Sequence, residues 1–171
     1  MSSDSGIRPS DSLLAVLAVR AGEYLLARGL RLATAESCTG GYVAKLLTDV
    51  PGSSRWFECG YVCYSNAAKE RDLAVSAATL RLHGAVSGET VEEMALGALA
   101  RTGADRAVTI SGVAGPDGGT ERHPVGEVWF GVGRKEAGVV DASVARRRFA
   151  GDRDAVRRQS AAFALELVLA S

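Results

Sequence analysis

Strand-like and helix-like segments alternate along the first two thirds of this chain, and two strand-like segments then follow one another with no helix between them. The two adjoining segments are residues 126–132 and 139–149. Alternation favours parallel strands joined by helices, whereas adjoining strands favour an antiparallel pair. The pattern predicts an α/β fold, a single layered domain with a mixed sheet covered by helices. Residues 1–9 are polar and are predicted to form a loose tail, which leaves residues 10–171 as the domain.

Apolar spacing and helix-capping residues predict where the individual elements begin and end. Apolar residues recur at helical spacing from Asp11 towards Gly29, and again in a final helix that begins near Asp152. Ser87 is a suitable N-cap for a helix that ends at Gly103. Further strands are predicted at residues 31–35, 60–64 and 107–110.

The charge balance and the scarcity of metal ligands limit the classes of partner. Twenty basic and twenty acidic side chains cancel, so no net field would draw the chain onto nucleic acid or an anionic membrane. We expect no secretion signal and no membrane-spanning segment. Three cysteines and two well-separated histidines support neither a disulfide framework nor a zinc site. The expectation is therefore a cytoplasmic protein with reduced thiols and no metal or cofactor.

The segment Thr34–Gly41 places Ser37 where a strand turns sharply into a helix. Such a turn lifts a serine hydroxyl out of the sheet. It also aims unpaired backbone N–H groups at a ligand, so an oxyanion or a phosphate could be held by the amides of Cys38, Thr39, Gly40 and Gly41. On this segment alone, an ordinary capped helix is the better interpretation. Cys38 is a rival nucleophile, because helix N-termini lower the pKa of a thiol. It ranks below Ser37.

The segment Tyr64–Lys69 supplies a base in a chain that has no suitably placed histidine. A serine needs a group that removes its proton, and lysine can do so when burial or a dipole lowers its pKa from about 10.4. Tyrosine can relay the proton or donate one to the leaving group. Ser–Lys pairs of this type are a known variant of the catalytic triad. The alternative is a solvated lysine beside a strand-terminal tyrosine.

Two further segments could bind an anionic ligand. The loop Ser111–Thr120 contains four glycines directly after a strand, which allows the backbone to approach a ligand closely. A long surface loop is the alternative interpretation. Arg153, near the start of the last helix, could pair with a phosphate. The alternative there is that Asp152 caps the helix and the arginine is solvated.

Seven ordered motifs resemble the CinA C-terminal-domain family, from about Leu13 to Leu169. They are Thr34–Gly41, Gly52–Ser54 with Trp56–Phe57, Tyr64–Asn66 with Ala68–Lys69, Gly84–Ser87, Ser111–Gly119, Pro124–Gly126 with Val128–Gly131, and Gly151–Asp154. Free-standing members of that family are nicotinamide-nucleotide amidohydrolases. Glu127 departs from the small residue expected at its position, which could alter an edge contact.

The resemblance implies that Ser37 is the nucleophile and that Tyr64 and Lys69 complete the catalytic set. In this hypothesis Lys69, linked through Tyr64, deprotonates Ser37, which attacks the carboxamide of nicotinamide mononucleotide and releases ammonia. Substrate contacts are predicted from Glu36, Asn66, Ser111, Gly112, Gly115 and Arg153. The resemblance also implies a homo-oligomer. Two alternatives stay open: a catalytically silent nucleotide-binding module, and an amidase that acts on a different amide.

Overall fold

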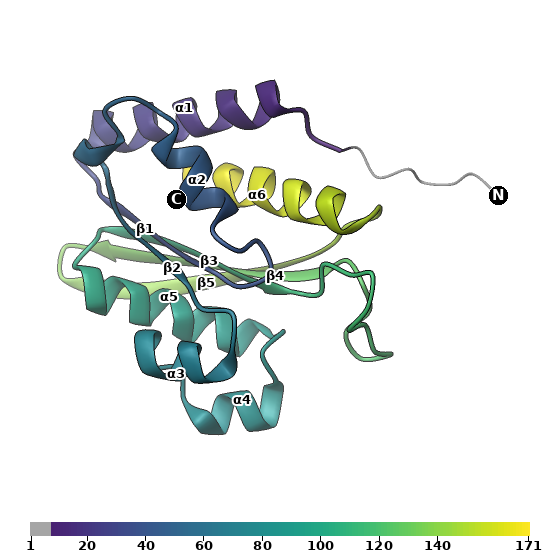
Figure 1. Ribbon diagram of the computed structural model, residues 1–171. Helices are drawn as coiled ribbons and strands as arrows, with labels where there is room; N and C mark the ends of the chain where they lie inside the picture. Colours follow the sequence, from purple (N-terminus) through teal and green to yellow (C-terminus); the bar gives the residue numbers. More distant parts are fainter. Residues whose placement is uncertain (1–7) are drawn as a thin grey trace.

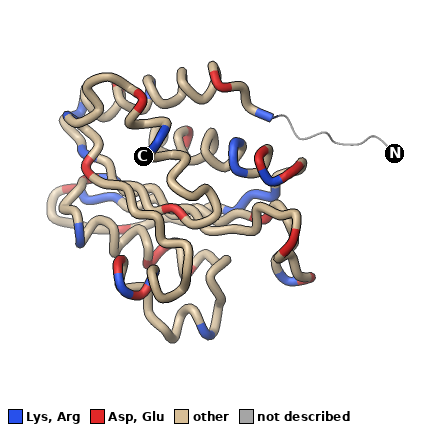
Figure 2. Tube along the Cα trace, in the orientation of Figure 1, with Lys and Arg blue, Asp and Glu red and all other residues tan. Residues whose placement is uncertain are grey.

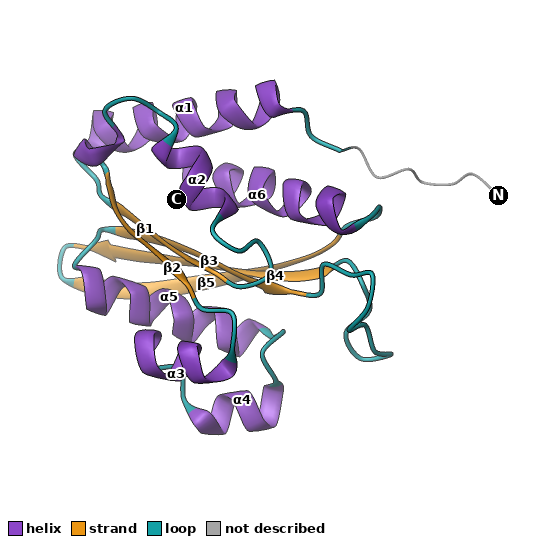
Figure 3. Ribbon diagram, in the orientation of Figure 1, coloured by secondary structure: helices purple, strands orange, loops and turns teal. Residues whose placement is uncertain are grey.

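The computed structural model describes residues 8–171, which form a five-stranded sheet between two layers of helices (Figure 1 and Figure 3). The strands are β1 (Leu32–Glu36), β2 (Phe57–Val62), β3 (Arg106–Gly112), β4 (Glu127–Glu136) and β5 (Val139–Arg148). The helices are α1 (Asp11–Arg28), α2 (Tyr42–Thr48), the short 3₁₀ helix η1 (Ser53–Arg55), α3 (Asn66–Leu73), α4 (Ala77–His83), α5 (Gly88–Thr102) and α6 (Arg153–Leu169).

The sheet is mixed, which confirms the predicted fold class. Its strand order is β2-β1-β3-β4-β5. Strand β1 lies parallel to both β2 and β3, whereas β4 is antiparallel to β3 and β5. The chain passes from β1 through α2 to β2 on one side, and β3 lies on the other side of β1. The carboxyl end of β1 is thus a switch point, the position where open α/β sheets form ligand crevices.

Helices α1, α2 and α6 cover one face of the sheet, and α3, α4 and α5 cover the other (Figure 1). Each layer buries its own cluster of apolar side chains against the strands. Glycine lets α5 approach the sheet closely, because a Cβ added at Gly131 would lie 2.3 Å from the carbonyl oxygen of Val91. The two close-packed cores hold the strand ends in fixed positions relative to the surrounding helices.

Most of the predicted helix boundaries are confirmed. Helix α1 ends at Gly29, which adopts the left-handed conformation, and Ser87 and Asp152 cap α5 and α6 by accepting hydrogen bonds from backbone amides. The predicted strand at 60–64 is wrong in its limits, since β2 starts earlier and ends at Val62. Helices α3 and α4 were not predicted, and α3 shows almost no separation of polar and apolar faces.

Residues 1–7 of the predicted tail lie outside the described residues. Its last two residues contact α6: Arg8 forms an ion pair of 2.5 Å with Asp154, and the carbonyl oxygen of Pro9 accepts a hydrogen bond of 2.7 Å from Nε of Arg158. Ser10 then caps α1 through its side chain. The start of α1 is therefore held against the start of α6.

Basic and acidic residues are interspersed along the described chain (Figure 2). None of the helices within residues 8–171 combines the length and the apolar character needed to cross a bilayer.

Candidate active site

A pocket of about 270 Å³ opens at the carboxyl ends of the three parallel strands. Ser37 follows β1, Tyr64 follows β2, and Ser111 lies near the end of β3; all three line the pocket. Helix α3 adds Lys69, and the first residue of α6 adds Arg153. Residues that lie far apart in the sequence thus meet at the switch point of the sheet.

Lys69 and Ser37 are in direct contact. Nζ of Lys69 donates to Oγ of Ser37 over 3.0 Å and to the carbonyl oxygen of Cys63 over 2.9 Å. A third, longer contact of 3.4 Å reaches the carbonyl oxygen of Tyr64. The lysine side chain is completely buried, and Ser37 is 8% exposed. The amine therefore lies in a fixed position within proton-transfer distance of the hydroxyl.

Burial lowers the pKa of Lys69, because the charged ammonium loses its water without gaining a carboxylate partner. The opposing influences come from the thiols of Cys63 and Cys38. Those thiols attract the ammonium only when ionised, and burial raises the pKa of both. Near neutral pH the opposition is therefore weak, which makes Lys69 a stronger candidate for a neutral amine than an exposed lysine.

Glu36 is buried and holds the start of α2. Its two carboxylate oxygens accept hydrogen bonds from the backbone N–H groups of Val43, at 3.1 Å, and Ala44, at 2.8 Å. Its own carbonyl oxygen accepts from the N–H of Cys63. The structure therefore does not place Glu36 in the pocket as the predicted substrate contact, and its carboxylate is already paired with backbone donors.

The loop Ser37–Gly41 leaves three amides, those of Cys38, Thr39 and Gly41, without an oxygen acceptor among residues 8–171. The N–H of Ser37 donates to the carbonyl of Ile110, and that of Gly40 donates to the carbonyl of Ser37. The N–H groups of Cys38 and Thr39 donate to no oxygen among residues 8–171. Cys38 lines the pocket, whereas Thr39, Gly40 and Gly41 do not. The N–H groups of Val43 and Ala44 in the first turn of α2 are not free, because they donate to the carboxylate of Glu36.

Cys38 lies beside Ser37 but has the opposite electrostatic setting from a reactive thiol. Burial raises its pKa to about 12, so the thiol stays protonated near neutral pH. The expected lowering by a helix terminus is absent because α2 begins only at Tyr42 and its first amides are capped by Glu36. Ser37 is accordingly the better candidate nucleophile.

The hydroxyl of Tyr64 contacts Arg153 and not Lys69. Nη2 of Arg153 donates to the Tyr64 hydroxyl over 3.1 Å, and Nη1 donates to the carbonyl of Gly115 over 2.8 Å. The tyrosine side chain is 60% exposed at the mouth of the pocket. Only the backbone oxygen of Tyr64 approaches Lys69, so the predicted side-chain link from the lysine through this tyrosine to Ser37 is not present.

The glycine-rich loop forms one wall of the pocket. Ser111, Gly112 and Gly115 all line it, although the hydroxyl of Ser111 already donates to the carbonyl of Ala85 over 2.7 Å. Gly115 has a φ of +80°, and an added Cβ would lie 2.6 Å from Val125. Only glycine therefore fits easily at this point of the loop.

One predicted ligand is not in the pocket, and one charged residue of the pocket was not predicted. Asn66 begins α3 with its side chain exposed and is not part of the lining. Asp117 lies in the glycine-rich loop and adds a carboxylate to the wall. Its position between glycines after a strand was the available signal, since polar residues of such loops face the ligand crevice.

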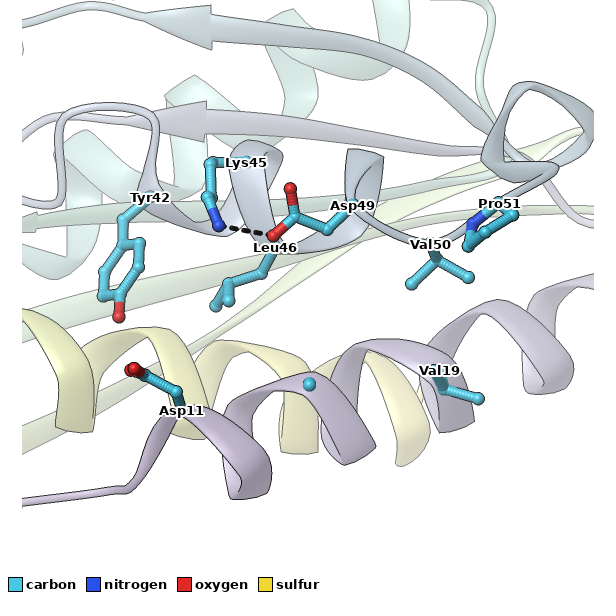
Figure 4. Close-up of a pocket in the computed structure, with 9 residues that line it drawn as sticks. Asp11, Val19, Tyr42, Lys45, Leu46, Asp49, Val50 and Pro51 are labelled. Carbon is cyan, nitrogen blue, oxygen red and sulfur yellow. Dashed lines mark hydrogen bonds and ion pairs between the residues drawn. The ribbon is translucent and has the colours of Figure 1, made fainter.

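A second hollow, of about 370 Å³, lies between α1 and α2 on the helical layer (Figure 4). Its apolar floor includes Val19, Leu46 and Val50, and its polar rim includes Lys45 and Asp49, which form an ion pair of 2.5 Å. It contains no serine or cysteine.

No group of three or more His, Cys, Asp or Glu side chains within residues 8–171 is arranged to hold a metal ion.

Comparisons with known proteins find similar sequences and structures along nearly the whole chain. A family profile described as "CinA C-terminal domain" matches residues 14–171. The chain is 54% identical over 157 residues to the nicotinamide-nucleotide amidohydrolase PncC of Escherichia coli K12, covering 92% of this chain and 93% of that protein. It is 51% identical over 156 residues to the Pseudomonas putida protein of the same name, covering 91% and 95%. The crystal structure of competence/damage inducible protein CihA from Agrobacterium tumefaciens superposes with a TM-score of 0.88 at 38% identity, covering 99% and 98% of the two chains.

Proposed function

Because this chain belongs to the CinA C-terminal domain family, we propose that it hydrolyses the carboxamide of nicotinamide mononucleotide to nicotinic acid mononucleotide and ammonia. The observation that carries the proposal is the contact of 3.0 Å between the buried amine of Lys69 and the hydroxyl of Ser37. The names of the relatives that match over nearly their whole length supply the substrate class.

In the first half of the reaction the neutral amine of Lys69 accepts the proton of Ser37. Oγ of Ser37 then forms a bond to the carboxamide carbon, and the carbonyl oxygen becomes an oxyanion. The amide of Cys38, which lines the pocket and lacks an oxygen acceptor in the described chain, is its proposed donor, and the amide of Thr39 beside it is a second candidate if the loop turns towards the pocket. As the C–N bond breaks, the ammonium of Lys69 returns a proton to the nitrogen, and ammonia leaves.

In the second half a water molecule attacks the acyl–Ser37 ester while Lys69 accepts one of its protons. The ester C–O bond breaks, Oγ of Ser37 is protonated again by Lys69, and the nicotinate nucleotide leaves. Tyr64 keeps a place in the proposed catalytic set, but as a phenol at the pocket mouth that contacts the substrate or the leaving nitrogen. Its contact with Arg153 argues against a relay from Lys69.

The ribose phosphate is proposed to bind at the mouth of the pocket, beside Arg153. Two of the guanidinium donors are used by Tyr64 and Gly115, which leaves others for a phosphate. Gly112 and Gly115 line the pocket and present backbone groups to a ligand, and Asp117 can accept hydrogen bonds from ribose hydroxyls. A neutral protein needs such a local grip on an anionic substrate, because its overall charge attracts none.

The test is ammonia release from nicotinamide mononucleotide by wild type, with free nicotinamide, nicotinamide riboside and unrelated amides in the same panel. We expect the mononucleotide to have the highest kcat/KM. Binding of the mononucleotide without ammonia release over hours would establish a silent binding module instead. Preference for free nicotinamide or for another amide would overturn the proposed substrate while leaving a hydrolase.

We also propose that the chain forms a homo-oligomer through the outer face of α1. Leu13, Val16, Val19 and Leu26 are between 41% and 54% exposed there, at spacings that place them on one side of the helix. The apolar groove of Figure 4 continues this face towards α2. Arg20 and Glu23 lie three positions apart on the same helix, so opposite charges are available for ion pairs between two antiparallel copies.

Light scattering coupled to size exclusion tests this assembly. Val16→Glu should convert the wild-type oligomer to monomers, whereas Leu82→Glu, at an exposed position on α4, should not. A monomeric wild type would contradict the proposal.

We further propose a cytoplasmic location, because three free cysteines suit a reducing compartment. Recovery of the protein in a secreted or membrane fraction would contradict this location.

A further inference from the structure

Arg157, on the second turn of α6, reaches across to the loop that carries Ser37. Its Nη2 donates to the carbonyl oxygen of Thr39 over 2.8 Å, a contact between residues 118 positions apart. Its guanidinium also lies 5.9 Å from the centre of the Tyr42 ring, at the limit of a cation–π contact. Arg157 therefore joins the C-terminal helix to the turn between β1 and α2.

Apart from Arg157, two backbone hydrogen bonds hold the middle of that loop: the N–H of Gly40 donates to the carbonyl of Ser37 over 3.0 Å, and the N–H of Tyr42 donates to the carbonyl of Thr39 over 3.2 Å. Glu36 fixes the start of α2, and the N–H of Ser37 is fixed on β3. Between them, Gly40 and Gly41 have φ values of +60° and +89°, and the buried hydroxyl of Thr39 has no partner among the described residues. The bond from Arg157 is the only side-chain hydrogen bond to the loop Thr39–Gly41 from within residues 8–171.

We infer that Arg157 is a positioning residue for the reaction, which holds the Thr39 carbonyl and thereby sets the direction of the Cys38 and Thr39 amides beside Ser37. The inference rests on the proposed function only in taking Ser37 as the nucleophile. Without the guanidinium, the Thr39 carbonyl keeps only the N–H of Tyr42, at 3.2 Å, as a donor, and the loop can rotate between its two fixed ends. A displacement of about 1 Å at a reacting group can cost about 100-fold in rate.

Arg158 offers a matched control on the same helix. Its Nε donates to the carbonyl of Pro9 over 2.7 Å, and its Nη2 contacts Asp11, so it ties α6 to the start of α1 and does not reach the Ser37 loop. Replacement of either arginine removes one guanidinium that links two parts of the fold. Only Arg157→Ala removes a link to the candidate nucleophile.

The experiment compares wild type, Arg157→Ala, Arg157→Lys and Arg158→Ala by thermal melting, by kcat and KM for nicotinamide mononucleotide, and by the rate of Ser37 modification with a fluorophosphonate. In that modification the Ser37 Oγ–P bond forms, the P–F bond breaks, fluoride leaves and Lys69 takes the proton. The modification needs no nucleotide, so it reports on the loop even if wild type fails to hydrolyse the mononucleotide.

We expect kcat and the modification rate of Arg157→Ala to fall on the order of 100-fold, with KM changed by less than about threefold. Guanidinium or methylguanidine in the buffer should restore part of the rate, and Arg158→Ala should stay within about threefold of wild type. If Arg157→Ala melts too early to assay, Arg157→Lys carries the comparison. Equal losses in the Arg157 and Arg158 variants, or a rise in KM alone, would overturn the inference.

Discussion

Two hollows of this molecule differ in the chemical groups they contain, and the larger of the two lacks a buried lysine. The groove between α1 and α2 has about 370 Å³ and an apolar floor, but its charged residues, Lys45 and Asp49, neutralise each other at an exposed rim. The pocket at the strand ends has about 270 Å³ and contains a completely buried lysine in contact with a serine.

The difference teaches that the basicity of a lysine here depends on its surroundings and not on the size of the space beside it. Lys45 is paired with Asp49, and that carboxylate raises the pKa of its amine. Lys69 lacks such a partner, and burial lowers its pKa. The topology explains the contrast, because only the carboxyl ends of parallel strands bring a loop, a helix start and a glycine-rich wall together.

The largest effect is expected when either Ser37 or Lys69, the two residues in contact in the strand-end pocket, is replaced. Ser37→Ala and Lys69→Met should each lower kcat by about a thousandfold or more, because members of a nucleophile–base pair act as a unit. The double variant should be no worse than the more damaged single one. Additive losses in a steady-state assay of ammonia release would show that the two residues act independently.

Arg153 tests whether the pocket mouth selects a phosphate. Arg153→Ala should lower kcat/KM for nicotinamide mononucleotide about 10- to 100-fold, mainly through KM, since a charged hydrogen bond contributes about 1.5–3 kcal/mol. Nicotinamide riboside, which lacks the phosphate, serves as the internal control for the lost contacts to Tyr64 and Gly115. An equal loss on both substrates would assign Arg153 to pocket structure instead.

A variant of Cys38 distinguishes the two neighbouring candidate nucleophiles, Ser37 and Cys38. With the thiol pKa raised to about 12, Cys38→Ala should retain activity to within about fivefold, the cost of one small cavity beside Ser37. Inactivation of wild type by a thiol reagent should be slow near neutral pH for the same reason. Loss of activity in Cys38→Ala together with full activity in Ser37→Ala would transfer the nucleophile to the thiol.

The smallest effect is expected in the groove. Lys45→Ala should leave kcat/KM within about twofold of wild type and leave the denaturant midpoint of unfolding nearly unchanged, because exposed i,i+4 ion pairs contribute little. Denaturant unfolding and the ammonia assay measure the two quantities. A large activity loss would mean that the groove, and not the pocket alone, takes part in the reaction.

Local patterns were sufficient to predict much of the fold. The caps at Ser87 and Asp152 and the glycine stop at Gly29 lie next to the helices they bound, and the adjoining strands near the C-terminus correctly indicated a mixed sheet. Helix α3 was not predicted, because its polar and apolar residues do not lie on separate faces. That helix brings Lys69 to the pocket. The contact between Lys69 and Ser37 could therefore be predicted from family resemblance but not from the spacing of residues along the chain.

The side-chain partners of the site depended on tertiary contacts that no local pattern contains. Glu36 was predicted to touch the substrate, yet the chain turns back so that its carboxylate meets the amides of Val43 and Ala44. Tyr64 was predicted to link Lys69 to Ser37, yet its hydroxyl meets Arg153, which lies 89 positions away. Both corrections concern where a polar group finds its partner, which folding decides over long sequence separations.

The most direct measurement of the central claim is the rate at which a fluorophosphonate modifies Ser37 as a function of pH. The amine must be unprotonated to accept the serine proton, so the rate should rise with pH through a single midpoint. Because burial lowers the pKa of Lys69, that midpoint should lie below about 10.4, the value of an exposed lysine, and the rise should be lost in Lys69→Met. A midpoint at or above that value, or an unchanged profile in Lys69→Met, would contradict a buried neutral lysine as the base.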